Sequence, residues 1–105
     1  MAKIISTDEF ENEVLNSSVP VIVDFYADWC MPCRMIAPSI DELSTELDGR
    51  AKVVKVNIDV SAGLASKYNV RGVPTIMFFK NGQAADTVVG AVPKEVLMDK
   101  LLSIL

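Results

Sequence analysis

The sequence predicts an α/β domain in which one mixed sheet of five strands is flanked by four helices. Two observations support this prediction. Segments typical of strands and of helices alternate along most of the chain, and two strand-like segments near its end flank the dipeptide Asn81-Gly82. Alternation favours parallel strands joined by right-handed crossovers, whereas this dipeptide favours a tight antiparallel hairpin. The expected order is βαβαβαββα, in a single domain over residues 1–105.

Short local patterns define the first two elements. The segment "KIIS" is a candidate for a short strand. Ser6, followed three residues later by Glu9, is typical of a capping box, and apolar residues then recur at helical spacing. These patterns predict a helix near residues 7–15.

The middle of the chain predicts a buried strand and a long helix. The run "PVIVDFYA" is apolar and β-branched except at Asp24, which is typical of a central strand covered on both faces. A helix then follows and ends near Gly49, and Pro38 inside it should introduce a kink. Its buried stripe consists of Ile36, Ile40, Leu43 and Leu47.

The remaining elements complete the sheet. "AKVVKVNID" predicts a strand and "SAGLASKY" a short helix, while "PTIMFFK" and "QAADTVV" predict the two strands of the hairpin. A terminal helix begins near Pro93. We expect this helix to pack through Leu97, Leu101 and Leu105.

Length, composition and charge exclude several classes of protein. The 105 residues, 50% of them hydrophobic, suit one buried core, and no segment approaches the ~20 consecutive apolar residues that cross a bilayer. The start "MAKIISTDEF" lacks a secretory pattern, so we expect a cytoplasmic protein without a membrane partner. The net charge is -4 and the basic residues are scattered, which argues against nucleic acid as a partner.

The chain contains no histidine, so neither catalysis nor metal binding can use an imidazole. Its two cysteines, Cys30 and Cys33, directly follow the predicted central strand. Chemistry in such sheets collects at the carboxyl ends of parallel strands. If a helix begins at the pair, both sulfurs lie on one side of it, and its free N–H groups and dipole favour a thiolate. Cys30 is therefore the candidate nucleophile of a thiol-disulfide exchange.

Two neighbours fit this interpretation of the pair. Pro32 suits an early helical position, where its missing N–H is not needed, and it stiffens the backbone between the cysteines. Arg34 adds a positive charge nearby.

Three other interpretations of the cysteines compete with redox chemistry. A structural zinc site needs about four ligands, and the chain supplies two thiolates plus carboxylates. A haem attachment site would need histidine in place of Arg34. A purely structural disulfide would close a very short loop and remove little entropy from the unfolded chain. Redox chemistry is the favoured interpretation.

Longer motifs resemble the thioredoxin family, in the same order and over essentially the whole chain. They are "DFYADWCMPCRMIAPSIDEL", "KVNID", "VRGVPTIMFFKNG" and "VVGAVPKEVL". The match rests on a combination of residues and not on the cysteine spacing alone: Asp24, Trp29, Pro38, Lys55, Val73, Pro74 and Gly90 accompany the pair. The resemblance implies the thioredoxin fold and a protein-disulfide reductase whose Cys30-Cys33 pair alternates between dithiol and disulfide.

Asp24 and Lys55 have two interpretations each. Burial in an apolar strand would raise the pKa of Asp24 toward neutrality, but a partly exposed aspartate with a hydrogen-bond partner fits the sequence equally well. Lys55 taken alone is an exposed strand residue. The resemblance implies instead that Asp24 is buried behind Cys33 and helps to deprotonate it, with Lys55 modulating the proton affinity of that carboxylate.

The Val73-Pro74 bond is expected to be trans on base rates alone. The resemblance implies a cis bond, with Pro74 against the cysteines and the Val73 backbone free to pair with an extended client segment. Trp29 and Met31 could simply contribute to packing. The resemblance instead implies a shallow substrate-binding patch around Cys30, formed by Trp29, Met31, Pro32, Val73, Pro74, Gly90 and Ala91.

Two residues depart from the usual family pattern. Met31 replaces a glycine, which adds an apolar side chain beside Cys30 and leaves the reduction potential and the choice of client open. Tyr26 stands where many members have tryptophan and retains aromatic packing.

The resemblance also implies the partners. These are client proteins with disulfides and a thioredoxin reductase that draws on NADPH through its own flavin, so that this chain binds no cofactor or metal itself. We expect a monomer. Two other functions compete with the reductase: a disulfide oxidase or isomerase, and a non-catalytic module that binds partners through the patch around Cys30.

Overall fold

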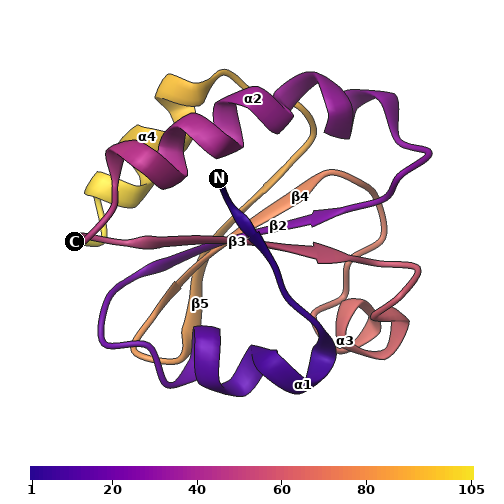
Figure 1. Ribbon diagram of the computed structural model, residues 1–105, viewed down its shortest axis with the longest axis horizontal. Helices are drawn as coiled ribbons and strands as arrows, with labels where there is room; N and C mark the ends of the chain where they lie inside the picture. The colour runs from indigo at the N-terminus through magenta and orange to yellow at the C-terminus, as the bar shows by residue number, and fades with distance from the viewer.

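One sheet separates two layers of helices in the computed structural model, which describes residues 1–105 (Figure 1). Helices α2 and α4 cover one face and α1 and α3 the other, which confirms that helices flank the sheet. The elements in order are β1 (Lys3–Ile4), α1 (Thr7–Phe10), η1 (Glu11–Leu15), β2 (Val21–Tyr26), α2 (Met31–Glu46), β3 (Lys52–Asn57), α3 (Ala62–Lys67), β4 (Thr75–Lys80), β5 (Gln83–Val89) and α4 (Lys94–Leu102).

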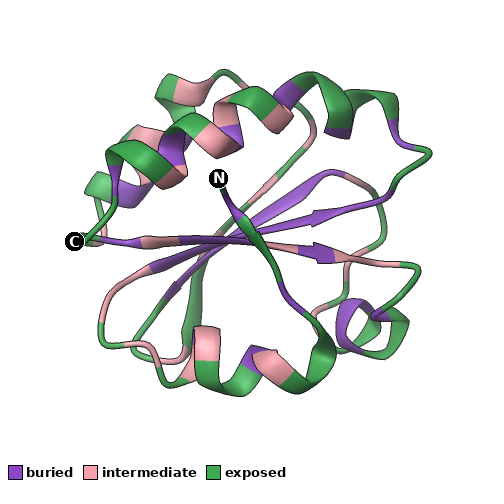
Figure 2. Cartoon of the chain, in the orientation of Figure 1, coloured by how far each residue is buried: buried purple, intermediate pink, exposed green.

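The order of the strands is β1-β3-β2-β4-β5, which places β2 at the centre. Strands β1, β3 and β2 are parallel, while β4 runs antiparallel to β2 and β5 antiparallel to β4. All six residues of β2 are buried, because a strand covered on both faces exposes neither set of its alternating side chains (Figure 2). The predicted mixed five-stranded sheet is confirmed.

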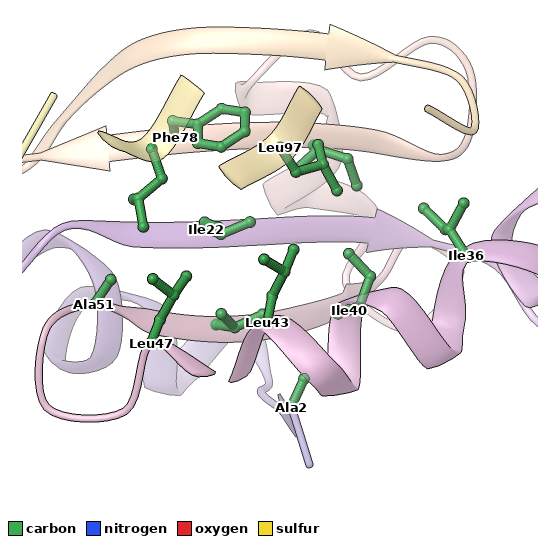
Figure 3. Packing of buried hydrophobic residues seen from close by; sticks show 12 residues of the cluster. Ala2, Ile22, Ile36, Ile40, Leu43, Leu47, Ala51, Phe78 and Leu97 are labelled. Atoms are coloured by element: carbon green, nitrogen blue, oxygen red, sulfur yellow. The ribbon is translucent and has the colours of Figure 1, made fainter. Parts of the chain in front are cut away.

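Alternation along β2 divides the core into two halves. Ile22 belongs to the cluster beneath α2 and α4, whereas its neighbours Val21 and Val23 belong to the cluster beneath α1 and α3. In the first cluster, Ile40 and Leu43 point from α2 toward the sheet (Figure 3). The predicted stripe of α2 is therefore the face that attaches this helix to the sheet.

Local signals set several element boundaries. The Glu9 carboxylate accepts a hydrogen bond from the N–H of Ser6 at 3.0 Å, and this contact begins the predicted first helix. The second half of that helix is a π-helix, in which the Asn16 N–H donates to the Glu11 carbonyl. Asn81 and Gly82 both have positive φ, at 53° and 78°, as a type I′ hairpin turn requires.

The prediction for the last apolar residue is wrong. Leu97 and Leu101 are fully buried, but Leu105 is 47% exposed. Helix α4 ends at Leu102, and the chain turns there through a hydrogen bond from the Ile104 N–H to the Leu101 carbonyl. Helical spacing no longer applies beyond this turn, and Ile104 packs against the core instead. None of the helices has the length and apolar character needed to span a bilayer.

Replacing Leu43 with alanine should lower the free energy of unfolding by about 3 kcal/mol, because this residue is fully buried between α2 and the sheet. Equilibrium unfolding of the oxidised protein in urea measures this change. The matched control is Met35→Ala on the exposed face of the same helix, for which a change within about 0.5 kcal/mol is expected. Equal losses in both variants would contradict the assignment of the buried stripe.

Candidate functional site

The cysteine pair lies where the central strand gives way to the long helix. Strand β2 ends at Tyr26, and Cys30 occupies the N-cap of α2 with an extended backbone. Its sulfur accepts a hydrogen bond from the Cys33 N–H at 3.1 Å. The two residues form a disulfide with their Cα atoms 5.2 Å apart. The predicted local closure of the pair is confirmed.

This position determines the chemistry available to Cys30. A side chain at the N-cap faces N–H groups that have no partner within the helix, and the helix dipole adds positive potential there. The Cys33 N–H already points at the Cys30 sulfur in the disulfide form. The same donor can stabilise a negatively charged Cys30 sulfur after reduction, which favours nucleophilic attack.

The disulfide lies beneath a rim of exposed apolar side chains. Cys30 and Cys33 are only 4% and 5% exposed, while Trp29 and Met31 on either side of Cys30 are 66% and 62% exposed. The interpretation of Trp29 and Met31 as packing residues is therefore wrong. Pro32 is also exposed, in the first turn of α2.

The Trp29 side chain is held by a loop that the sequence analysis missed. Its indole N–H donates to the Asp59 carboxylate at 2.9 Å. The Asn57 side-chain oxygen in turn accepts hydrogen bonds from the N–H groups of Asp59 and Val60. An asparagine at the end of a strand is the one local signal for such a turn. Nothing in the sequence indicates that this turn meets Trp29.

The loop before β4 brings Val73 to the cysteines. The Val73-Pro74 bond is cis, as the family resemblance implies, and Val73 packs against the buried cluster that contains both cysteines. The N–H of Gly90 donates to the Pro74 carbonyl at 2.9 Å, and Ala91 follows on the surface. Neither the N–H nor the carbonyl of Val73 forms a hydrogen bond within the chain. These main-chain groups are available to another backbone.

Asp24 is a buried carboxylate without a hydrogen-bond partner. It is 1% exposed, and neither of its oxygens meets a donor. Burial raises its pKa from 3.8 to about 6, and the positive charge of Lys55 opposes part of this rise. Lys55 occupies the position directly beside Asp24 in the pairing of β2 with β3. The interpretation of Asp24 as a partly exposed, hydrogen-bonded residue is wrong, and Lys55 is half-buried.

A surface hollow of about 320 Å³ lies beside Cys33 and Lys55. Cys33, Lys55 and Tyr26 are among its lining residues. Arg34 lies at the same hollow, and its guanidinium donates to the main-chain carbonyl of Asp28 at 2.7 and 3.1 Å. The structure contains no group of three or more His, Cys, Asp or Glu side chains placed to share a metal ion.

Comparison with known proteins gives a consistent result. Residues 1–103 match the family model described as Thioredoxin. Thioredoxin 1 of Synechococcus elongatus is 52% identical over 101 residues, which are 96% of this chain and 94% of that protein. Thioredoxin 1 of Nostoc sp. is 53% identical over 97 residues, or 92% of this chain and 91% of that protein. The chloroplastic M-type thioredoxin of Pisum sativum is 48% identical over 94% of this chain and 58% of its own length.

The native protein should lose stability as the pH rises from about 4 to about 6, because the pKa of Asp24 is raised by burial. Replacing Asp24 with asparagine should remove this loss. The pKa of Asp24 is about 6 in the folded protein and near 3.8 without burial, so between these values only the folded state holds the proton. The free energy of unfolding therefore contains a contribution that is complete below pH ~4 and lost by pH ~6, of about 3 kcal/mol.

Urea unfolding of both proteins from pH 4 to pH 8 measures this difference. Glu9, Glu13 and Asp86 have pKa values lowered by hydrogen bonds and ion pairs, and they contribute equally to both curves. The exposed Asp99→Asn variant serves as the control. Parallel curves for native protein and Asp24→Asn would show that Asp24 titrates normally.

Proposed function

Because this chain belongs to the thioredoxin family, we propose that Cys30 attacks client disulfides and that Cys33 resolves the product. Membership of the family makes the chain a protein-disulfide oxidoreductase that works through the Cys30-Cys33 pair. The observation that supports the division of roles is the hydrogen bond from the Cys33 N–H to the Cys30 sulfur at the start of α2. This donor would stabilise a Cys30 thiolate, whereas Cys33 is the third residue of the helix.

The proposed reaction has two exchange steps. The Cys30 thiolate attacks one sulfur of the client disulfide, whose other sulfur leaves as a thiolate. Cys33 then loses its proton and attacks the Cys30 sulfur, which breaks the mixed disulfide and releases the second client sulfur. Two electrons pass from the cysteine pair to the client, and the Cys30-Cys33 disulfide forms.

Asp24 is the proposed acceptor of the Cys33 proton. A pKa of about 6 keeps this carboxylate largely ionised at neutral pH, yet close enough to neutrality to bind a proton transiently. The hollow that Cys33 shares with Lys55 offers water a route to this part of the protein. Lys55 adds positive charge beside the carboxylate and favours release of the proton once resolution is complete.

The client is proposed to bind as an extended segment beside Val73. The free N–H and carbonyl of Val73 can pair with the client backbone on one side of the disulfide. Apolar contacts around it would come from the patch residues Trp29, Met31, Pro32, Gly90 and Ala91, whereas Pro74 of the predicted patch is buried. Such a site would recognise the backbone and the disulfide sulfur of the client and depend little on the client's other side chains.

A reductant must regenerate the dithiol after each cycle. We propose a thioredoxin reductase that passes electrons from NADPH through its flavin, with this chain acting as a monomer that binds no cofactor of its own. We also propose a cytoplasmic location, where thiols are kept reduced. The names of the Synechococcus and Nostoc relatives give no compartment, while the pea relative is named chloroplastic. Reduction of insulin disulfides, coupled to such a reductase and NADPH, tests the whole cycle.

Replacing Cys33 with serine should trap client proteins as mixed disulfides on Cys30, because the second exchange step then has no thiol. Non-reducing electrophoresis followed by mass spectrometry detects these adducts. Cys30→Ser is the matched control and should form none. Partner binding that survives replacement of both cysteines would support a non-catalytic binding module instead.

Replacing Met31 with glycine should make the Cys30 thiolate easier to form and raise the reduction potential accordingly. The Met31 side chain flanks Cys30 at the first position of α2, and removing it lets water reach the thiolate. The rate of Cys30 alkylation against pH and equilibration with glutathione measure the two quantities. Unchanged values with an intact fold would show that this departure from the family pattern is neutral for the chemistry.

A further inference from the structure

Lys55 differs from the lysines that form ion pairs in this protein. Lys3, Lys52, Lys94 and Lys100 each have a carboxylate within salt-bridge distance, whereas Lys55 has none. Its ammonium nitrogen lies 4.6 Å from the centroid of the Tyr26 ring instead. This distance is within the range of an energetically significant cation–π contact.

The Tyr26 ring is a rigid support for that contact. Tyr26 is buried at the end of β2 and belongs to the same small cluster as Ala27, Cys30 and Cys33. Asp24 precedes it by two positions on the same strand, so the two side chains share the face of the sheet that α2 covers. Lys55 is the residue of β3 directly beside Asp24. The Lys55 side chain therefore has the Asp24 carboxylate and the Tyr26 ring as neighbours on the same face of the sheet.

Few other charged or titratable groups face Asp24. The residue beside Asp24 in strand β4 is Ile76, which is apolar, and the hollow beside Lys55 is lined by Cys33 of α2. Asp28 and Arg34 lie at the hollow, and the Arg34 guanidinium is engaged by the Asp28 carbonyl. Lys55 is therefore the cation whose location matters for this carboxylate.

We propose that Tyr26 is a positioning residue whose ring holds the Lys55 ammonium group beside the buried Asp24 carboxylate. Lysine has a long, flexible and strongly hydrated side chain, and without the ring its charge would move outward into solvent. The cation would then act on Asp24 through water and less strongly. The effect on catalysis rests on the proposed proton transfer to Asp24, but the effect on Asp24 itself does not.

The direction in which the Asp24 pKa changes distinguishes a positioning role of Tyr26 from a merely structural one. A smaller residue at position 26 admits more water, and hydration alone would lower the pKa of Asp24. Movement of the Lys55 charge away from Asp24 would instead raise the pKa of Asp24. We therefore expect the Asp24 pKa to rise in Tyr26→Leu, by on the order of half a pH unit.

Carboxyl carbon NMR of the oxidised protein, titrated from pH 3 to pH 9, measures this pKa directly. Tyr26→Phe and Tyr26→Trp retain a ring and should remain close to the native value. Lys55→Gln should raise the pKa at least as much as Tyr26→Leu, and the double variant should show no further rise beyond Lys55→Gln. Tyr26→Met supplies a second variant without a ring if Tyr26→Leu does not fold.

Three results would overturn the proposal. The first is an unchanged or lowered Asp24 pKa in both ringless variants. The second is a rise in Tyr26→Phe equal to that in Tyr26→Leu, which would assign the effect to the hydroxyl group. The third is full additivity of Tyr26→Leu and Lys55→Gln.

A separate readout tests the proton transfer on which the catalytic effect rests. The rate of mixed-disulfide resolution against pH should shift in parallel with the Asp24 pKa. A shifted pKa with an unshifted resolution profile would support the positioning role of Tyr26 and contradict the role of Asp24 as proton acceptor.

Discussion

The burial of β2 on both faces is the constraint on which the site depends. Strand β2 lies at the centre of the sheet and is buried between the two layers of helices. The position of its carboxyl end therefore determines where Cys30 lies. The same burial excludes water from Asp24, whose oxygens meet no donor. A single strand thus leads into the disulfide and raises the proton affinity of Asp24. The apolar packing that stabilises the fold is also what destabilises the charge of Asp24.

Most of the fold could be predicted because its signals are local. The β-branched run of β2, the spacing of Ile36 and Ile40 in α2 and the Asn81-Gly82 turn each act over a few residues. Leu105 shows the limit of this reasoning, since periodicity cannot reveal that the helix ends before the pattern does. The sequence likewise contains no local signal for the π-helical turn after Phe10.

The site was predictable only in part, because its decisive contacts join residues distant in sequence. The cysteine spacing indicates redox chemistry and is a local signal. The hydrogen bond from Trp29 to Asp59 and the cation–π contact of Lys55 with Tyr26 form only after β2 and β3 have paired. The burial of Asp24 likewise depends on the layers above and below the sheet. For this residue and for the cis bond at Pro74, family resemblance gave what the residues alone left open.

In the proposed binding mode, the unpaired main chain of Val73 has a consequence for the conformation of the clients. Any segment that aligns with it must bring amide and carbonyl groups that are not already engaged in a helix or sheet of its own. A disulfide embedded in regular secondary structure has to fray before it can be accommodated, while one in a loose or misfolded region fits at once. Selectivity of this kind responds to the local order of the target, with no need for a sequence code.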